Sequence, residues 1–379
     1  MNVSRPVWTR RLEDGWASAP IVWLTGVRRL GKTVLARSMP DSDFFNCDLP
    51  STEARFRDPE TALSAVRGPL LVLDEVHQLP DPSRLLKIAA DSFPGLRLLA
   101  TGSSTLAATS KFRDSLAGRK RVVELTPVLV EELPAFGIRD LDRRLLHGGL
   151  PQPLQAEKAT TDFYSEWLDS YFSRDVQELF HLEKRGAFLR TALLVLAQSG
   201  GMLDATAMAK HVGVSRPTIL HWLDVLQITH FARLLSPFSG GGRREIIAQP
   251  KLYGFDTGFV CHASGWDSLR SGDRGVLWEH LVLETLVSIP VARIHYWRDK
   301  QQREVDFVLP RSRDLVDAIE CKWNPDAFEP RSLAVFREAY PRGRNLVVSP
   351  GIPSQYTRNF RDLEVTFLPI TELRGLLAG

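Results

Sequence analysis

The stretch "IVWLTGVRRLGKT", Ile21 to Thr33, joins an apolar run to a turn bounded by glycines and then to a helical pattern. Its last eight residues fit G-x-x-x-x-G-K-[ST], in which the N–H groups of the turn and the helix N-terminus surround a phosphate. The lysine of this motif reaches the β- and γ-phosphates, and the final hydroxyl binds Mg²⁺. The sequence has no pattern specific for guanine, so ATP and Mg²⁺ are the predicted cofactors. The expected contact residues are Gly26, Arg28, Arg29, Leu30, Gly31, Lys32, Thr33 and Val34, with Thr33 as a metal ligand.

Apolar runs on the C-terminal side of this stretch predict the fold around it. They alternate with helical patterns, as expected for a parallel sheet that helices cover on both faces. The runs are "DFFNCD" (43–48), "LLVLDE" (70–75), "RLLATGS" (97–103) and "RVVEL" (121–125). Together with the first motif, they predict an α/β fold of the P-loop ATPase type.

Two of these runs end in residues that suit phosphate chemistry. Asp74 would hold Mg²⁺ and Glu75 would polarise the attacking water, although a solvated acidic pair at a strand end is the alternative. Ser103 or Ser104 could sense the γ-phosphate, and either could equally be a helix N-cap.

Arginines give two further candidates. Arg119 in "LAGRKR" could reach the nucleotide of a neighbouring subunit, because a planar guanidinium suits γ-phosphate charge; a solvated surface arginine is the alternative. This role would require a homo-oligomer whose subunits share nucleotide sites. In "YFSRDV", Arg174 and Asp175 are another candidate pair, for which an intrachain salt bridge is the simpler interpretation.

The middle of the chain reads as helical. A helix, a turn at Gly213 and a second helix capped by Ser215 predict a helix-turn-helix, whose second helix would present Arg216, Thr218 and His221 to DNA. The segment "GGGRREI" (240–246) would be a wing, with Arg243 and Arg244 on phosphates. Such modules also serve in packing or in protein–protein contacts, which is the alternative.

The last third carries a second set of charged residues on predicted strands. Asp306 lies in "REVDFVLP", and Glu320 and Lys322 lie in "AIECKWN" on one side of the next strand, the pattern of PD-(D/E)xK nucleases. Asp306 and Glu320 would bind Mg²⁺, with Mn²⁺ possible, and Lys322 would position and help deprotonate the attacking water. Glu279 shares an apolar helix stripe with Leu283, where a carboxylate is costly unless paired or metal-bound, so it is the third expected ligand. The alternative is an ion-pair network that stabilises a small sheet.

Composition sets broad limits. Apolar residues make up 44% and charged residues 25% of 379 residues, as in globular proteins, and the net charge of +3 permits but does not indicate nucleic-acid binding. The three scattered cysteines argue against a disulfide framework and a cysteine-rich zinc site. We find no bilayer-spanning stretch and no signal peptide, so the sequence predicts a cytoplasmic protein without a membrane partner.

Taken together, the motifs resemble a bacterial and archaeal family of AAA-type ATPases fused to a C-terminal domain of unknown function. The resemblance extends from Ile21 to about Val348 and rests on "GVRRLGKT", "LVLDEVHQLP", "TGSS", "LAGR", "GGLP", "YFSRDV", "PKLYGFDTGF", "GVLWEHLVLETL", "YWRDKQQREVDFVL" and "IECKW". It implies ATP binding at Gly31, Lys32 and Thr33, hydrolysis that depends on Asp74 and Glu75, and a restriction-endonuclease-like fold at the end of the chain.

These observations predict four domains. They are an AAA-type P-loop ATPase domain (1–135), a helical lid or linker (136–186), a winged-helix-like domain (187–250) and a PD-(D/E)xK nuclease-like α/β domain (251–379). We expect an ATP-hydrolysing protein that acts on DNA through a metal-dependent nuclease. One alternative is an ATP-driven switch or scaffold whose nuclease fold binds DNA or protein without cutting. The other is an ATP-dependent transcription regulator that uses the winged helix.

Overall fold

The chain folds into two compact units that alternate along the sequence. The computed structural model describes residues 3–102, 116–158, 160–177, 180, 182, 184–239, 249–290 and 293–378. Unit 1 comprises Met1–Thr126, Asp169–Leu182 and Ile228–His230, and unit 2 comprises Pro127–Leu168, Glu183–Gln227 and Phe231–Gly379. None of the helices in these ranges combines the length and the apolar character needed to cross a bilayer.

Unit 1 contains the predicted parallel sheet. Its strands are β1 (Ile21–Thr25), β2 (Ser42–Asn46), β3 (Leu70–Asp74), β4 (Arg97–Thr101) and β5 (Lys120–Glu124), in the order β2-β3-β4-β1-β5. Every neighbouring pair is parallel, so each of the five predicted strands is confirmed. Because β3, β4 and β1 are consecutive and parallel, their C-terminal ends share one edge of the sheet. This is the edge at which α/β proteins bind ligands.

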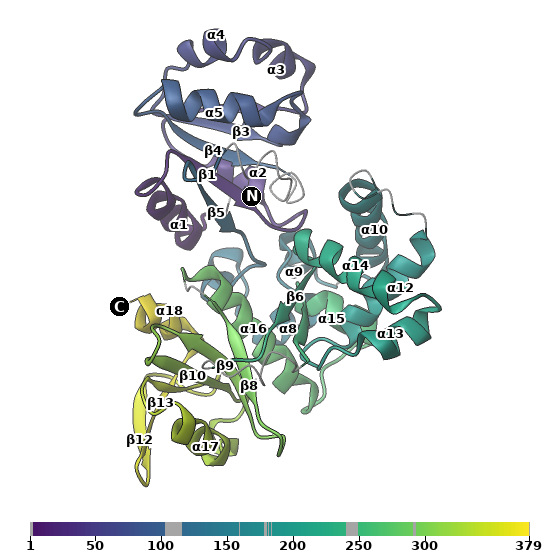
Figure 1. Cartoon of the computed structure of the whole chain (residues 1–379), viewed down its shortest axis with the longest axis vertical. Helices are drawn as coiled ribbons and strands as arrows, with labels where there is room; N and C mark the ends of the chain where they lie inside the picture. The colour runs from purple at the N-terminus through teal and green to yellow at the C-terminus, as the bar shows by residue number, and fades with distance from the viewer. Residues whose placement is uncertain are drawn as a thin grey trace. The chain divides into compact units, whose positions relative to one another are not determined.

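Helices cover both faces of this sheet. One face packs Trp23, Leu71 and Leu98 in a single core cluster with Leu86 of α5 and Leu63 of α4. On the opposite face α1 comes so close that a Cβ on its Gly15 would lie 2.7 Å from Val22. Figure 1 shows α5 along the sheet, with α3 and α4 beyond it. The helical elements of this unit are α1 (Pro6–Trp16), α2 (Lys32–Arg37), α3 (Pro50–Arg55), α4 (Pro59–Ser64), the 3-10 helix η1 (Val76–Gln78), α5 (Pro82–Ser92) and the π-helix η3 (Phe172–Gln177).

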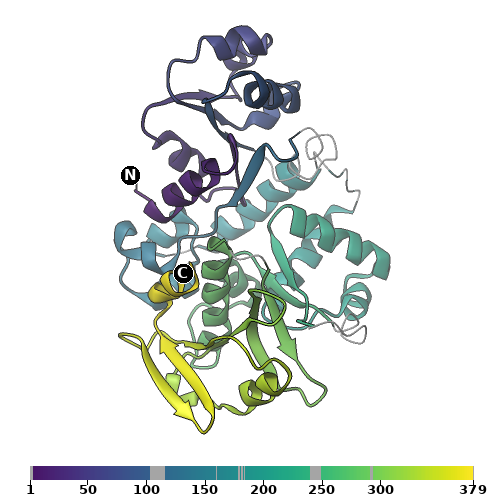
Figure 2. The same ribbon diagram turned by 60° about the vertical axis from the view of Figure 1, so that its left-hand side comes forward.

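Unit 2 ends in a mixed sheet. Its strands are β8 (His295–Arg298), β9 (Glu304–Pro310), β10 (Val316–Cys321), β11 (Asn345–Val348), β12 (Tyr356–Phe360) and β13 (Leu363–Leu368). The order is β12-β13-β11-β10-β9-β8; β10, β11 and β13 are parallel, and the other pairs are antiparallel. The sheet contains the strands that the apolar runs "EVDFVLP" (304–310), "VDAIECKW" (316–323), "NLVVSP" (345–350) and "EVTFLPI" (364–370) predict. Two further strands, β8 and β12, were not predicted. Figure 2 shows the β12–β13 hairpin (yellow) at one edge of the sheet.

Two helices fix this sheet in unit 2. Leu333 and Phe336 of α17 (Arg331–Ala339) belong to the same core cluster as Val316 of β10. The predicted helix α16 (Asp273–Ser288) packs on the sheet through Trp278, whose Nε1 donates to the carbonyl of Val348 at 2.9 Å. The sheet is therefore held by an apolar core against α17 and by a buried aromatic anchor from α16.

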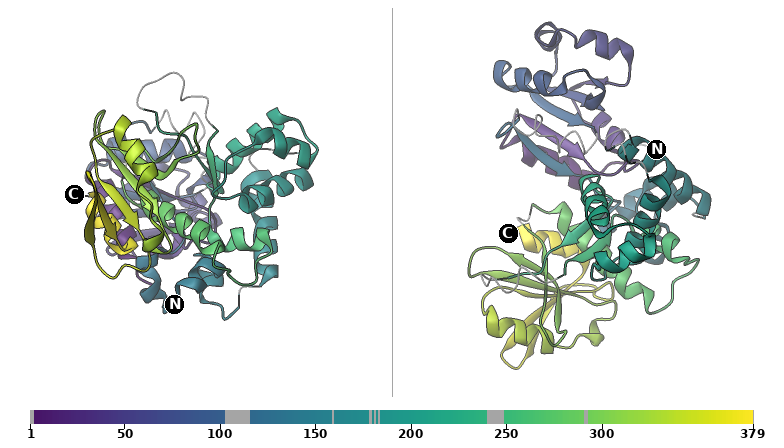
Figure 3. Two further views of the ribbon diagram at one scale, coloured as in Figure 1. Left: turned by 90° about the horizontal axis from the view of Figure 1, so that it is seen from below. Right: turned by 45° about the vertical axis from the view of Figure 1, so that its right-hand side comes forward.

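The remaining elements of unit 2 are mainly helical. Asp204 accepts hydrogen bonds from Thr206 N and Ala207 N at the start of α13, and Ser215 Oγ accepts one from Thr218 N at 3.3 Å at the start of α14. An antiparallel pair, β6–β7, follows α14 in the chain, and Figure 3 shows α12, α13 and α14 (teal) as a cluster. The elements are the 3-10 helix η2 (Val130–Phe136), α8 (Leu141–His147), α9 (Pro151–Gln155), α10 (Thr161–Tyr171, which ends in unit 1), α12 (Arg185–Ala197), α13 (Ala205–Val212), α14 (Arg216–Ile228), β6 (Ala232–Leu235), β7 (Lys251–Gly254), α15 (Thr257–Ser264), the 3-10 helix η4 (Pro325–Ala327) and α18 (Ile370–Ala378).

Candidate functional site

The predicted nucleotide loop connects β1 to α2. Its backbone takes positive φ values at Gly26 (130°), Arg29 (64°) and Gly31 (92°), which wind the chain into a tight turn. A Cβ on Gly26 would lie 2.5 Å from the carbonyl oxygen of Leu125, so only glycine fits there. The leucine and valine of the predicted contact set differ in exposure, since Leu30 is buried and Val34 is exposed.

Lys32 lies over this turn. Its Nζ donates to the carbonyl oxygens of Gly26 and Val27, each at 2.9 Å. Burial lowers the pKa of Lys32, and the carboxylates of Glu75, Asp175 and Asp74 oppose that effect. The loop therefore holds a partly desolvated cation at the position where the motif places phosphate.

A carboxylate and two hydroxyls meet beside the lysine. Thr33 Oγ1 donates to Asp74 Oδ1 at 3.2 Å, and Thr101 Oγ1 donates to the same oxygen at 2.6 Å. Hydroxyl and carboxylate oxygens are the ligands that Mg²⁺ takes in nucleotide sites, so the residues fit this ion. Thr101 was not predicted, although its place at the end of the strand beside β3 could have identified it. Ser103 and Ser104 lie outside the described residues.

Glu75 directly follows β3 in a left-handed conformation, with φ 55° and ψ 43°. This conformation costs a non-glycine residue about 1 kcal/mol or more. Its N–H donates to Thr101 Oγ1 at 3.0 Å, and its Oε2 lies 3.3 Å from His77 Nδ1. The backbone is thus fixed by the neighbouring strand, and the carboxylate lies beside the imidazole of His77.

The side chain of Arg28 contacts a segment that is distant from the loop in the sequence. Its Nη1 donates to the carbonyl of Ser170 at 2.7 Å and lies 3.3 Å from Asp175 Oδ2. Asp175 therefore makes an intrachain salt bridge, as the sequence suggested, and its partner is Arg28. The neighbouring Arg29 is exposed.

Arg119 occupies a different part of the unit. It precedes β5, at the edge where the parallel strands begin, and its guanidinium makes a two-pronged contact with Asp91 at 2.6 and 3.1 Å. The nucleotide loop lies at the other ends of these strands. A role for Arg119 at a neighbour's nucleotide remains a prediction.

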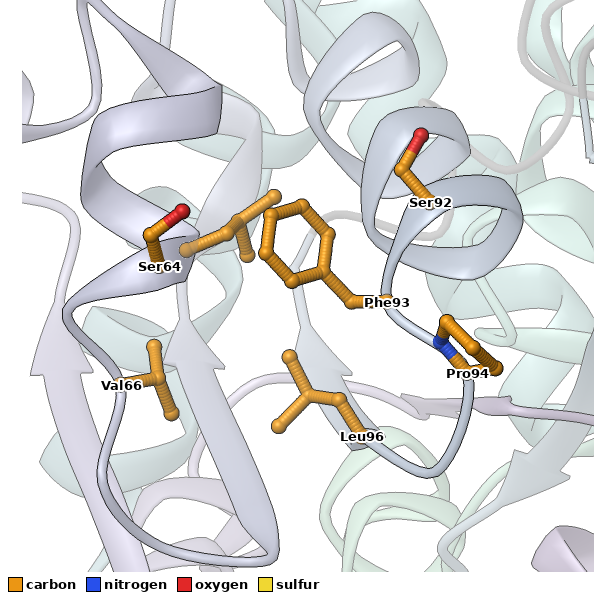
Figure 4. Close-up of a pocket in the computed structure, with 7 residues that line it drawn as sticks. Ser64, Val66, Ser92, Phe93, Pro94 and Leu96 are labelled. Carbon is orange, nitrogen blue, oxygen red and sulfur yellow. The ribbon is translucent and has the colours of Figure 1, made fainter.

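A hollow of about 350 Å³ also lies at the edge where the strands begin (Figure 4). Leu63, Val66, Phe93 and Leu96 line it, with Ser64 and Ser92 at its sides. These residues provide no charge for a phosphate, so the hollow is not part of the nucleotide site.

In unit 2 the predicted nuclease residues lie on adjacent strands. Asp306 of β9 accepts a hydrogen bond from Cys321 N at 2.7 Å, and Lys322 Nζ lies 2.7 Å from Glu320 Oε2 and 3.7 Å from Asp306 Oδ2. Burial raises the pKa of Glu320 to about 8, and the charge of Asp306 contributes to this shift. The structure therefore brings these three residues together.

Glu279 of α16 is neutralised by a lysine that the sequence analysis did not identify. Glu279 Oε1 lies 2.8 Å from Lys251 Nζ and accepts a hydrogen bond from Tyr253 OH; Lys251 also lies 2.6 Å from Glu304 Oε1. Burial raises the pKa of Glu279, and Asp306 adds to this effect. Burial alone would lower the pKa of Lys251, but the surrounding carboxylates raise it above its ordinary value. No local motif marks Lys251, because its partners come from α16 and β9.

The carboxylates of this cluster fit a divalent cation in kind and charge. Glu279, Glu304, Asp306 and Glu320 outnumber the two lysines. Burial is the main cause of the raised pKa values of Glu279 and Glu320, and the charge of Asp306 adds to both shifts. Within the described ranges, however, no three His, Cys, Asp or Glu side chains are placed to hold a metal ion. Cation binding would therefore require Lys251 or Lys322 to release a carboxylate.

Of the predicted DNA-reading residues of α14, Arg216 and His221 are exposed, whereas Thr218 is half-buried. Leu220 is also exposed, and Asp224 adds an exposed negative charge to this helix. Arg243 and Arg244 lie outside the described residues. The described part of this surface is thus mixed in character.

Three successive regions of the chain match models of known protein domains. An AAA domain matches residues 18–134, a domain of unknown function (DUF8612) matches residues 138–270, and another (DUF4143) matches residues 274–373. Uncharacterized protein Rv2008c of Mycobacterium tuberculosis is 32% identical over 329 residues, which cover 82% of this chain and 72% of that protein. Uncharacterized protein Mb2031c of Mycobacterium bovis has the same values. This chain belongs to their family.

The family's AAA domain contains the nucleotide loop, Asp74 and Glu75, so unit 1 has the sheet of a P-loop ATPase. The region matched by DUF4143 contains Glu279 and the Asp306–Glu320–Lys322 group. Among solved structures, the Walker-type ATPase PABY2304 of Pyrococcus abyssi is 14% identical, with a TM-score of 0.43 over 69% of this chain and 95% of that chain. A DNA replication initiation factor is 13% identical, with a TM-score of 0.27 over 56% of this chain and 70% of that chain.

Proposed function

We propose that this protein binds and hydrolyses ATP with Mg²⁺ in unit 1. The observation that carries the proposal is the meeting of Thr33, Asp74 and Thr101 beside the Lys32 turn. Thr33 and Asp74 would hold Mg²⁺, and Lys32 would neutralise the β- and γ-phosphates. Glu75 would orient and polarise the attacking water. Mg²⁺ would supply charge stabilisation at the transferred phosphoryl group.

Lys32→Ala is expected to weaken ATP binding at least about tenfold, because it removes the cation that would neutralise the β- and γ-phosphates. Equilibrium titration with a fluorescent ATP analogue measures the effect. Lys87→Ala is the matched control, since Lys87 is exposed on α5. If Lys32→Ala binds ATP as tightly as the wild type does, the proposed nucleotide site is wrong.

We further propose that unit 2 acts on DNA through a metal-dependent nuclease site. Asp306, Glu320 and Glu279 would hold Mg²⁺ or Mn²⁺, and Lys322 would position the attacking water. The cation would supply Lewis-acid stabilisation of the phosphate under attack. The supporting observations are the placement of these groups on β9, β10 and α16 and their shared excess of negative charge.

The order of the elements supports a finer division of the chain. We propose a winged helix in residues 187–250, because α13, a left-handed Gly213, α14 and the strand β6 follow one another as in such a module. Residues 1–135, 136–186 and 251–379 would be the ATPase domain, the lid and the nuclease-like domain. DNA would be the partner, and subunits of a homo-oligomer would share nucleotide sites.

Lys322→Ala is expected to lower the rate of DNA cleavage at least about tenfold, because the water loses its positioning cation. Labelled single- and double-stranded DNA with Mg²⁺ or Mn²⁺, with and without ATP, provides the assay. Lys300→Ala is the control, as Lys300 is an exposed lysine that follows β8. Cleavage that persists in Lys322→Ala would place any nuclease activity elsewhere.

A second candidate function is favoured by the ion pairs of Lys251 and Lys322. Because each lysine neutralises carboxylates that a metal would need, the nuclease-type fold could bind DNA or a protein without cutting. This candidate predicts that the wild-type protein cleaves no substrate while DNA still stimulates ATP hydrolysis. Cleavage by the wild-type protein that Asp306→Ala abolishes would exclude it.

A further inference from the structure

The nucleotide loop is tied to a segment about 140 residues further along the chain. Arg28 Nη1 is shared between the carbonyl of Ser170, at 2.7 Å, and Asp175 Oδ2, at 3.3 Å. Ser170 lies in the last turn of α10, and Asp175 lies in the π-helix η3. Single π-helical turns are rare and cluster at functional sites, since their wider hydrogen-bonding pattern is less stable than the α-helix.

The carboxylate of Asp175 depends on the cations of this loop. Burial raises the pKa of Asp175, and the charges of Arg28 and Lys32 oppose this shift. Arg28 contacts Asp175 directly and belongs to the loop that would hold the phosphate. Asp175 and a phosphate would therefore require the same guanidinium.

We propose that Asp175 is a nucleotide-sensing positioning residue: it neutralises Arg28 when the loop holds no nucleotide, and a bound triphosphate displaces it. The inference rests on the ATP binding proposed above. A guanidinium binds carboxylates and phosphates with the same N–H groups, and a triphosphate carries more charge than a carboxylate. ATP binding is thus coupled to release of η3 from Arg28.

The effect of ATP binding should stay within the short segment η3, because the residue before η3 is anchored. Tyr171 is fully buried, and its hydroxyl lies 2.6 Å from Thr229 Oγ1. Residues 172–177 follow this anchor, and Asp175 is the acidic residue among them. Displacement of its carboxylate should therefore loosen the π-helical turn while the end of α10 stays in place.

Asp175→Asn is expected to tighten ATP binding about fivefold to tenfold, because it removes the internal competitor for Arg28 and preserves the shape of the side chain. A fluorescent, non-hydrolysable ATP analogue reports the affinity of the full-length protein. AMP should show no gain, since it lacks the phosphates that replace the carboxylate. Asp175→Glu, which retains the charge, should restore affinity close to that of the wild type.

Asp14→Asn is the matched control. Asp14 is an exposed aspartate of α1, outside the residues proposed for the nucleotide site, so its change should leave ATP affinity unchanged. If Asp175→Asn binds ATP as tightly as the wild type, or more weakly at an unchanged melting temperature, the proposal is wrong. If the wild type itself fails to bind ATP, the proposed function fails instead, so the two failures are distinguishable.

Hydrogen exchange provides a second measurement. In the wild type, amides of residues 172–177 should exchange faster with the ATP analogue bound than without it. Arg28→Gln without nucleotide should already show the faster exchange, and this variant tests the contact even if Asp175→Asn folds poorly. Exchange in 172–177 that is insensitive both to the analogue and to Arg28→Gln would overturn the proposal.

Discussion

Glu75→Gln is expected to lower the rate of ATP hydrolysis at least about 100-fold, the usual contribution of a positioned general base. The affinity for ATP should stay within about twofold of the wild-type value, because glutamine preserves shape and removes only the charge that activates water. Glu75 is held in a left-handed conformation, and its backbone is bonded to Thr101. Phosphate release and binding of a fluorescent ATP analogue measure the two quantities.

The control for this experiment is Glu60→Gln. Glu60 is an exposed glutamate in the first turn of α4, and its loss should leave hydrolysis unchanged. A decrease in ATP affinity that matches the decrease in rate would mean that Glu75 shapes the binding site and does not activate water. Hydrolysis at the wild-type rate would assign the general base to another residue.

Two of the predicted strands show why a sequence can reveal them. β1 and β3 are buried along their whole length, so both faces demand apolar side chains and leave an unbroken run in the sequence. Two strands of the mixed sheet, β8 and β12, escaped prediction and lack this property. β8 has four residues, and β12 is an edge strand with three exposed polar residues at its centre, so neither produces a run or an alternation.

The same contrast holds for the candidate sites. The loop residues, Asp74 with Glu75, and Glu320 with Lys322 are close in sequence, so spacing alone revealed them. Thr101, Asp175 and Lys251 reach their partners across strands or from remote helices. Their roles depend on tertiary pairing, which no local pattern encodes.

A buried polar network in unit 2 illustrates how such remote pairing supports a site. Arg144 of α8 is fully buried, and its guanidinium donates to the carbonyl of Val128 at 2.7 Å and to Thr257 Oγ1 at 2.9 Å. It also forms a salt bridge with Glu284 of α16. Because α16 carries Glu279 one turn earlier, Arg144 helps to fix the helix that presents a predicted metal ligand.

Arg144→Met is expected to lower the free energy of unfolding by about 3–5 kcal/mol, the usual cost of leaving a buried charge without its partner. The side chain of Glu284 is only 7% exposed, so water cannot replace the guanidinium. Urea unfolding followed by tryptophan fluorescence measures the change. Arg139→Met, at an exposed arginine nearby in the sequence, should change stability by less than about 0.5 kcal/mol.

The cause of this loss can be separated by a double-mutant cycle with Glu284→Gln. If an uncompensated carboxylate causes the loss, Arg144→Met should cost at least about 1 kcal/mol less in the Glu284→Gln background, because the buried charge is gone. Additive effects would instead assign the cost to the hydrogen bonds with Val128 and Thr257. The cycle therefore decides whether α16, the helix that carries Glu279, is held by the charge pair of Arg144 with Glu284 or by the hydrogen bonds of Arg144 to Val128 and Thr257.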